Sequence, residues 1–459
     1  MPKVAPIIVA ALPIPNTMSA TTLYGLLDKV LNGLLDHKIK VISYACDGTE
    51  VERSVQRILV SKADSEGNVV RKAIKDPHGG PELVIEIVIF RGQHIAIIQD
   101  SKHCLKTMRN NLFSGARCLV MGNYTALYDH IRQVAVEDKS PIYRRDVFKL
   151  DRQDDNAAQR LFSADTLEYL LDNHPNYRGD AVYLFAFGEL VDAYQNRWIS
   201  HSDRLTMVLR ARYFLDAWEA FLAISKYPRA RYFISREAAD ILRIIIEGFI
   251  SLLYIHRDYL GTPAPLLPWL HSSEACEHVF AEARKIVKDF SMLDFFYMVP
   301  KLRIKIRHAL LSSRISNSKA RANGYNHTYI DSTGIDIVKL GTFPTDEEIE
   351  EISEIAGAEA KELISFLGIR AEQLISIRNL ALPAQAAAMP DHESDEEELD
   401  IDNESDSDEE SICEQEELQK LIEESARTAH IDRRNAVEQR ILTLTSAATA
   451  LTTNDLTAV

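Results

Sequence analysis

The hydrophobic pattern of the chain changes near residue 125. Before it, segments with the two-residue period of a strand alternate with segments that have the 3.6-residue period of a helix. From residue 126 to residue 251 only long helical patterns follow, rich in Leu, Ala, Arg and aromatic residues. The sequence therefore predicts an α/β unit followed by an all-helical unit.

Apolar runs and their flanking turn residues define the expected elements. We expect helices at 21–35, 49–59, 271–290 and 343–368, and strands at 7–12, 38–46, 69–70, 82–90, 94–100 and 116–122. The first strand is expected to be buried, because residues 1–14 are largely apolar but contain internal prolines and lack the charged start of a signal peptide.

A chain of 459 residues has room for two or three domains. Changes of composition suggest five units along it. They are the first part of the core at 1–125, a helical insertion at 126–260, the helical second part of the core at 261–385, a disordered acidic linker at 386–415 and a C-terminal helix or tail at 416–459.

The net charge of −16 is concentrated in one segment. Residues 391–410 contain 13 acidic residues and no Lys or Arg, and without them the chain would carry only −3. Such dense like charge predicts disorder. Residues 418–444 beyond it could form an amphipathic helix that binds the chain itself or a partner protein. The nearly neutral remainder leaves DNA binding open.

Cysteine usage and hydropathy indicate the cellular setting. Five widely spaced cysteines without a CxxC pair are typical of reduced thiols inside the cell, and they indicate neither a disulfide framework nor a zinc module. No apolar run reaches the roughly 20 residues that a membrane span needs. We therefore expect a nuclear or cytoplasmic protein that is not secreted and not bound to a membrane.

Carboxylates at the expected strand ends are the main candidates for chemistry. Asp47 and Asp100 end predicted strands, and Glu277 lies on a predicted helix. Two-metal phosphoryl transfer needs such carboxylates on rigid elements, because they hold divalent ions about 3.5–4 Å apart. The alternative is structural, since an Asp in this position commonly caps a turn or the next helix, and Asp47 within CDGTE suits that role.

Four segments around these residues occur in the order seen in one protein family. They are SYACDGTEVERSVQRIL, IIQDSKHCLKTMRNNLFSG, KLDRQDDNAAQRLFSADTLEYL and LLPWLHSSEACEHVFAEAR. Over residues 5–310 the chain resembles the P element-like transposases, including their vertebrate and fungal relatives. The resemblance implies an α/β fold with a ribonuclease-H-like mixed sheet and a large all-helical insertion, to which this chain adds a helical, partly disordered C-terminal tail.

The resemblance also implies roles for single residues. The family motif around the second catalytic carboxylate is matched by Asp100, His103, Lys106, Arg109 and Asn110. The motif around the last carboxylate is matched by Glu274, Glu277, Phe280 and Arg284, with Glu274 where an Asp is usual.

Asp100 and Glu277 are thus the implied catalytic ligands of Mg²⁺ or Mn²⁺. Asp47 and Glu274 are candidate substitutes for missing carboxylates. The supporting residues implied around them are His103, Asn110 and Arg284.

Departures from the family pattern point to impaired catalysis. In the family the first catalytic Asp lies on a strand upstream of the segment that resembles PIIVAALPI, and here the sequence starts at Met1 without it. Either this ligand is missing, which we favour, or Asp47 replaces it, or the sequence is incomplete at its start. Losing one of three carboxylates would misplace the attacking oxygen, and a small misplacement alone can cost about 100-fold in rate.

Two binding modules seen elsewhere are not expected here. Some relatives carry a guanine-nucleotide insertion, but this chain has neither a GxxxxGK phosphate loop nor an NKxD motif, so we expect no nucleotide site. No run of Cys and His with metal-ligand spacing indicates a zinc finger.

Basic residues near both motifs form the candidate DNA-binding surface, because Lys and Arg neutralise backbone phosphates. The candidates are Lys102, Lys106, Arg109, Lys301 and Arg303. The alternative for the last two is an ordinary solvated helix face.

The sequence therefore predicts a transposase-derived DNA-binding protein that resembles a metal-dependent strand-transfer enzyme but is catalytically impaired. The alternative, from a different functional class, is a non-catalytic scaffold in which the same fold persists and the acidic tail recruits a protein partner.

Overall fold

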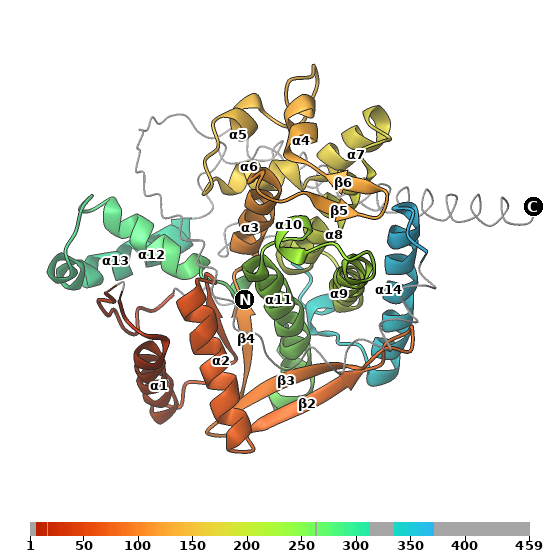
Figure 1. The fold of residues 1–459 in the computed structure, drawn as a ribbon. Coiled ribbons are helices and arrows are strands. Elements are labelled where there is room, and N and C mark those ends of the chain that lie inside the picture. Colours follow the sequence, from red (N-terminus) through yellow and green to blue (C-terminus); the bar gives the residue numbers. More distant parts are fainter. Residues whose placement is uncertain (1–5, 16, 262–263, 313–334, 371–459) are drawn as a thin grey trace, which may run out of the picture.

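The computed structural model describes residues 6–15, 17–261, 264–312 and 335–370 (Figure 1). Within these residues the chain forms a four-stranded mixed sheet, a two-stranded sheet and fourteen α-helices. The mixed α/β class predicted from the hydrophobic pattern is therefore confirmed. Both parts of the tail, 386–415 and 416–459, lie outside the described residues.

The larger sheet has the strand order β1-β4-β3-β2. The strands are β1 (Ser43–Cys46), β2 (Val69–Ile74), β3 (Leu83–Phe90) and β4 (Gln93–Gln99). The last three form an antiparallel meander, whereas β1 pairs in parallel with β4. Arg91 and Gly92 join β3 to β4 with φ values of 48° and 80°, which suit the tight turn of a two-residue hairpin.

Helices cover both faces of this sheet (Figure 1). Helices α1 (Ala20–Asp36) and α2 (Glu50–Ser65) pack on the face that presents Val88 and Ile97. Helix α11 (Arg236–Tyr254) packs on the face that presents Ile87 and Ile98. Because successive strand residues point to opposite faces, the continuous apolar runs of β3 and β4 supply both cores.

The helical region begins after α3 (Ser101–Phe113) and a small hairpin of β5 (Leu119–Met121) and β6 (Tyr124–Ala126). Its helices share one hydrophobic core with the sheet, and α8 is buried on every side. The remaining helices of this region are α4 (Tyr128–Val134), α5 (Arg144–Phe148), α6 (Asp155–Leu161), α7 (Ala164–Asn173), α8 (Arg178–Gln195), α9 (His201–Ile224), α10 (Arg229–Tyr232) and a π-helical turn, Ile255–Tyr259, that extends α11.

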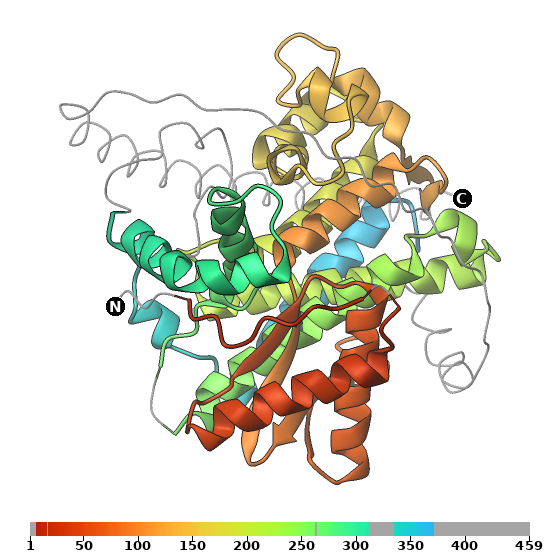
Figure 2. The same cartoon turned by 90° about the vertical axis from the view of Figure 1, so that its left-hand side faces the viewer.

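The C-terminal described segments pack in two places. Helices α12 (Glu274–Arg284) and α13 (Met292–Ser312) form a separate small apolar cluster beside α1 and α2 (Figures 1 and 2). Helix α14 (Asp346–Phe366) packs along α9, and Thr345 and Glu348 form a capping box at its start. Two short 3₁₀ turns, Pro268–Leu270 and Lys339–Gly341, flank these segments. No helix among the described residues is long and apolar enough to cross a membrane.

Most predicted elements are confirmed, but two strand predictions need correction. Residues 7–12 form no strand, and Ile7, Val9 and Leu12 are exposed. Prolines at positions 6, 13 and 15 flank this short run, and proline cannot donate to a strand ladder. The strand predicted at 38–46 starts only at Ser43.

Helix α11 approaches the sheet closely at Gly248. A Cβ atom at this position would lie 2.6 Å from the carbonyl oxygen of Ile97 in β4. At Gly25 in α1, by contrast, no atom outside the helix's own backbone lies within 4 Å of the added carbon. Alanine substitutions at these two glycines therefore distinguish the effect of helix propensity from the effect of packing against β4.

We predict that Gly248→Ala lowers the free energy of unfolding by about 1–3 kcal/mol, because α11 must move away from β4. Gly25→Ala should raise it by about 0.5–1 kcal/mol through helix propensity alone. Chemical denaturation of both variants measures the difference. Equal effects of the two substitutions would contradict the packing of α11 on β4.

Candidate functional site

Two carboxylates lie side by side at the carboxyl edge of the parallel strand pair. The last paired residues of β1 and β4 are Cys46 and Gln99, and the residues that follow them are Asp47 and Asp100. The backbone N–H of Asp100 donates to the carbonyl of Cys46 at 3.0 Å, which fixes the two strand ends together. The carboxyl edge of parallel strands is where ligands commonly bind in α/β proteins.

The Asp100 side chain joins the starts of two helices. Its Oδ1 accepts hydrogen bonds from the backbone N–H groups of Lys102 (2.8 Å) and His103 (2.9 Å), and thereby caps α3. Its Oδ2 accepts from the backbone N–H (3.0 Å) and the hydroxyl (3.1 Å) of Ser273, the residue before α12. A carboxylate offers about four lone-pair positions, and four protein donors use those of Asp100.

The first turn of α12 brings Glu277 close to both strand-end carboxylates. Partial burial is the main cause that raises the pKa of Glu277 above its usual value. The negative charges of Asp100 and Asp47 raise this pKa further, whereas Lys106 lowers it. Positions 47, 100 and 277, which are far apart in the sequence, therefore form one acidic cluster.

Two lysines form ion pairs with carboxylates next to this cluster. Lys102 forms an ion pair with Glu274 at 2.9 Å, and Lys106 forms one with Asp155 at 3.0 Å. Both lysines come from α3, whose start is capped by Asp100. The pair between α3 and Glu274 lies next to the Ser273 contact, so α3 and α12 are joined at two neighbouring points.

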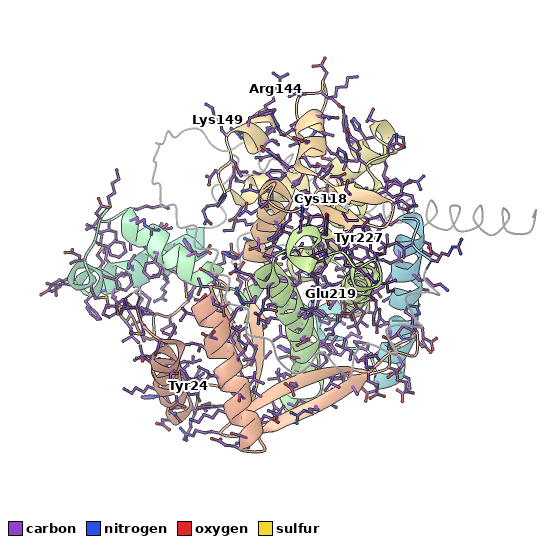
Figure 3. All side chains as sticks on the ribbon, in the orientation of Figure 1. Tyr24, Cys118, Arg144, Lys149, Glu219 and Tyr227 are labelled. Atoms are coloured by element: carbon purple, nitrogen blue, oxygen red, sulfur yellow. The ribbon has the colours of Figure 1, made fainter. Side chains whose placement is uncertain are left out.

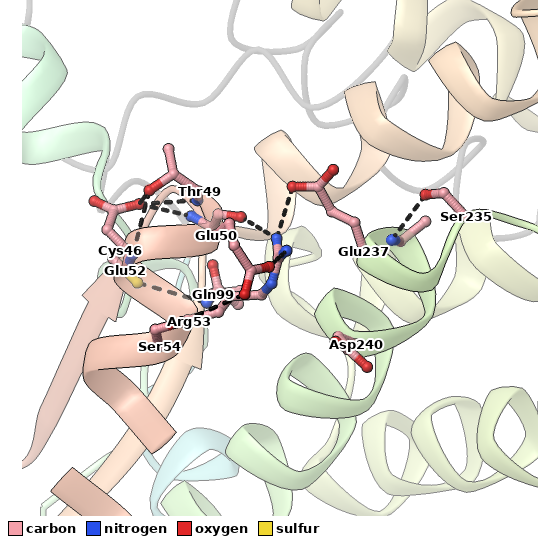
Figure 4. A network of polar contacts seen from close by, with 12 residues as sticks. Cys46, Thr49, Glu50, Glu52, Arg53, Ser54, Gln99, Ser235, Glu237 and Asp240 are labelled. Carbon is pink, nitrogen blue, oxygen red and sulfur yellow. Dashed lines mark hydrogen bonds and ion pairs between the residues drawn. The ribbon is translucent and has the colours of Figure 1, made fainter. Parts of the chain in front are cut away.

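The loop that follows β1 and Asp47 is fixed to α2 and α11 through Arg53 (Figure 4). Gly48 has φ of +98°, and a Cβ atom there would lie 2.5 Å from Oε1 of Gln99. Arg53 donates to the Gly48 carbonyl and pairs at 2.8 Å with Glu237 of α11. Within the described part of the chain, the buried Oδ1 of Asp47 has no hydrogen-bond partner.

Other residues of the sequence motifs have structural positions. Arg109 is completely buried and donates to the backbone carbonyls of Asp151 and Asp154, just before α6. Asn110 donates to the carbonyl of Arg152 at 3.3 Å. Arg109 and Asn110 therefore anchor the loop before α6 to α3, and in this position Arg109 is not presented to DNA.

The remaining predicted residues lie toward solvent. His103 is half-buried and uses its backbone N–H in the cap of α3, and Arg284 is exposed in the last turn of α12. Lys301 and Arg303 are exposed on α13. Lys102 and Lys106, by contrast, are the two candidates engaged in the ion pairs described above.

The donor set does not fit a two-metal centre as the side chains stand. Bridging carboxylates in such a centre must turn free oxygen lone pairs toward the ions. All four hydrogen-bonding positions of Asp100 are already used by protein donors. In the described ranges, no group of three or more His, Cys, Asp and Glu side chains is arranged to hold a metal ion.

Sequence reasoning missed Ser273 and Asp155 as members of the site. Asp155 follows the helix cap Asp154, and an acidic residue in the first turn of a helix is too common to indicate a site. Ser273 precedes an acidic helix start, as many serines do, and only the fold shows that it meets a carboxylate 173 residues away. Comparison of the chain with protein-family models, with curated proteins and with solved structures finds no match.

We predict that Asp100→Asn lowers the free energy of unfolding by about 1–2 kcal/mol. Asn can still cap α3, but its amide N–H₂ would face the N–H of Ser273 and the α12 contact would be lost. Thermal or chemical denaturation measures the change.

The control is Glu277→Gln, which removes a like charge and should leave stability unchanged or slightly raised. If Asp100 served only to bind a metal ion, removing its charge in the metal-free protein would relieve repulsion within the acidic cluster. Asp100→Asn would then stabilise the protein, as Glu277→Gln is expected to do. Stabilisation by Asp100→Asn would therefore contradict the structural role.

Two histidines lie against Phe343, and a third contacts one of them. His201 stacks on the Phe343 ring at 5.1 Å, and His256 lies 6.2 Å from that ring and 6.0 Å from the ring of His271. Burial lowers the pKa of His201 to about 4 and that of His271 to about 3. Nδ1 of His271 also lies 2.8 Å from the Ser43 hydroxyl of β1.

We predict that the protein loses stability as the pH falls from about 6.5 to about 4. Because the folded pKa of His201 lies below the unfolded value, the unfolded chain takes up the proton first and stability rises with pH in this window. A single such histidine contributes at most about 3 kcal/mol. In denaturation measured at several pH values, His201→Gln should flatten the dependence. The exposed His37→Gln control should not flatten it.

Proposed function

We propose that this chain is a transposase-derived DNA-binding protein. In this proposal the carboxylates of the former metal-dependent strand-transfer site now connect secondary-structure elements and bind no metal ion. The fold we propose for its core is ribonuclease-H-like. Mg²⁺ or Mn²⁺ would be the cofactor of the ancestral reaction.

The observation that carries the proposal is the set of hydrogen bonds made by Asp100. The resemblance implies that Asp100 and Glu277 meet at one site, and the acidic cluster with Asp47 agrees with this expectation. The oxygen of Asp100 that faces α12 is nevertheless used by Ser273. To bind two ions, the protein would have to give up the contact that holds α12 to β4.

Positive charge supports a DNA-binding role on α13, the helix that follows the acidic cluster. Lys301, Arg303 and Arg307 are exposed there. In the part of the chain that the structure describes, none of these three forms an ion pair with an acidic side chain. Unpaired basic side chains on one helix can neutralise successive phosphates of a nucleic-acid backbone.

A scaffold without DNA binding is the second candidate. The observation in its favour is that Lys106 and Arg109, two of the basic residues predicted to bind DNA, are buried and engaged inside the protein. This leaves α13 as the main basic surface among the predicted residues. Binding measurements on α13 variants therefore separate the two candidates.

We predict that the purified protein retards duplex DNA in a salt-dependent manner. Lys301→Glu with Arg303→Glu should weaken binding at least tenfold and reduce the slope of log K against log salt by about two, because two phosphate contacts are lost. The matched control is Arg144→Glu with Lys149→Glu. Both of these residues are exposed on the lobe of α4 to α6, away from α13 (Figure 3).

The outcomes distinguish the alternatives. If the protein does not retard DNA at low salt, the scaffold is favoured. If the control substitutions weaken DNA binding as much as those on α13 do, α13 is not the binding surface. With Mg²⁺ or Mn²⁺ present, we expect no nicking or joining of the DNA. Strand cleavage that disappears in Asp100→Ala would contradict the loss of catalysis.

A further inference from the structure

Helix α13 exposes an apolar stripe that the described part of the chain leaves uncovered. Leu293, Phe296, Tyr297 and Ile304 are 63%, 55%, 78% and 70% exposed. Phe296 and Tyr297 follow Leu293 by three and four residues, and Ile304 follows Tyr297 by seven, so all four lie on one side of the helix. The opposite side, with Leu302 and Ile306, packs into the small cluster with α12. The side chains of α12 and α13 project at the outer edge of the molecule (Figure 3).

Basic side chains border this stripe. Lys301 and Lys305, four residues apart, lie along one border, and Arg303 and Arg307 lie along the other. Lys301, Arg303 and Arg307 are exposed, and Lys305 lies 3.8 Å from Glu282 of α12. Glu282 also pairs with Lys285 at 2.7 Å, so it neutralises little of the charge on α13. A partner for this surface should therefore combine a high density of acidic groups with aliphatic side chains.

The chain itself contains a segment of this kind. Residues 391–410 hold 13 acidic residues without Lys or Arg, and Leu399 and Ile401 lie among them. About 20 residues separate this segment from Arg370, where the described part of the chain ends. A stretch of that length can span at most about 70 Å when fully extended. A tethered segment is present at an effective concentration on the order of millimolar, so weak contacts suffice for binding.

We propose that the acidic segment 391–410 docks on the basic and apolar face of α13. Carboxylates of the segment pair with Lys301, Arg303 and Arg307, while Leu399 or Ile401 contacts the apolar stripe of α13. Docking is favoured at low salt, because ion pairs at an exposed surface are screened over about 10 Å at 0.1 M salt.

The docked segment would compete with DNA for α13, and this consequence rests on the proposed function. Because the acidic segment and the DNA phosphates are both negatively charged, they cannot bind the same lysines and arginines at the same time. The docking itself does not require that DNA binds, so the two can be tested separately.

Carbodiimide cross-linking of the full-length chain tests the docking. The reagent joins a lysine amine to a nearby carboxylate, and mass spectrometry locates the new amide. We expect links from Lys301 and Lys305 to residues 391–410 at low salt, at least fivefold more abundant than links from the exposed Lys139 and Lys149 to the same residues. The Lys285–Glu282 pair serves as the internal positive control.

A variant that keeps Lys301 and Lys305, whose cross-links are measured, provides a second test of the docking. Arg303→Glu with Arg307→Glu should reduce the links from Lys301 at least threefold, and 0.5 M salt should reduce them in the wild type. A mixture of ¹⁵N-labelled and unlabelled chains separates links within one chain from links between two. Links that occur only between chains would assign the surface to a second copy, and equal yields at all exposed lysines would overturn the proposal.

DNA binding by a second variant tests the competition. Replacing the 13 acidic residues of 391–410 by Asn and Gln keeps the length of the chain and should tighten DNA binding at least threefold. If intrachain links form but no variant binds DNA, the docking stands and the proposed function fails. If DNA binds and no links form, the function stands and the docking fails.

Discussion

The contact between the Asp100 carboxylate and the starts of two helices organises the centre of this protein. Asp100 directly follows β4, caps α3 with one oxygen and accepts hydrogen bonds from Ser273 at the start of α12 with the other. Backbone N–H groups at a helix start carry partial positive charge, so a carboxylate placed between two of them is strongly stabilised. One side chain thereby connects the sheet, the helix that follows it and a helix about 170 residues further along the chain.

This arrangement explains how an acidic cluster can persist in a folded core. Asp47 and Glu277 lie close to Asp100, and mutual repulsion alone would drive them apart. Lys102 and Lys106 project from α3 and pair with Glu274 and Asp155 at the border of the cluster. Lys102 and Lys106, which their charge made candidates for DNA binding, therefore neutralise carboxylates within the protein.

Local signals allowed much of the fold to be predicted. The cap at Thr345, the helix after Thr49 and the strands β3 and β4 follow from residue types within a few positions of each other. The adjacency of Asp47 and Asp100 was implied by two strand ends, and the parallel register supplies it. The strand expected at 7–12 failed because its flanking prolines outweigh a short apolar run.

The candidate site was less predictable, because its contacts are long-range. Nothing in the sequence near Ser273 indicates that it meets Asp100, and nothing near Arg109 indicates burial against the carbonyls of Asp151 and Asp154. A motif can therefore identify the right residues and still leave open whether they hold an ion or hold the fold together. Here the hydrogen bonds of Asp100 favour the second role.

A crystal structure determined with Mn²⁺, using its anomalous scattering, tests this claim most directly. The account predicts that the hydrogen bonds from Ser273 to Asp100 remain and that no anomalous peak lies within bonding distance of Asp100. A pair of peaks bridged by Asp100 and Glu277, with Ser273 displaced, would contradict it.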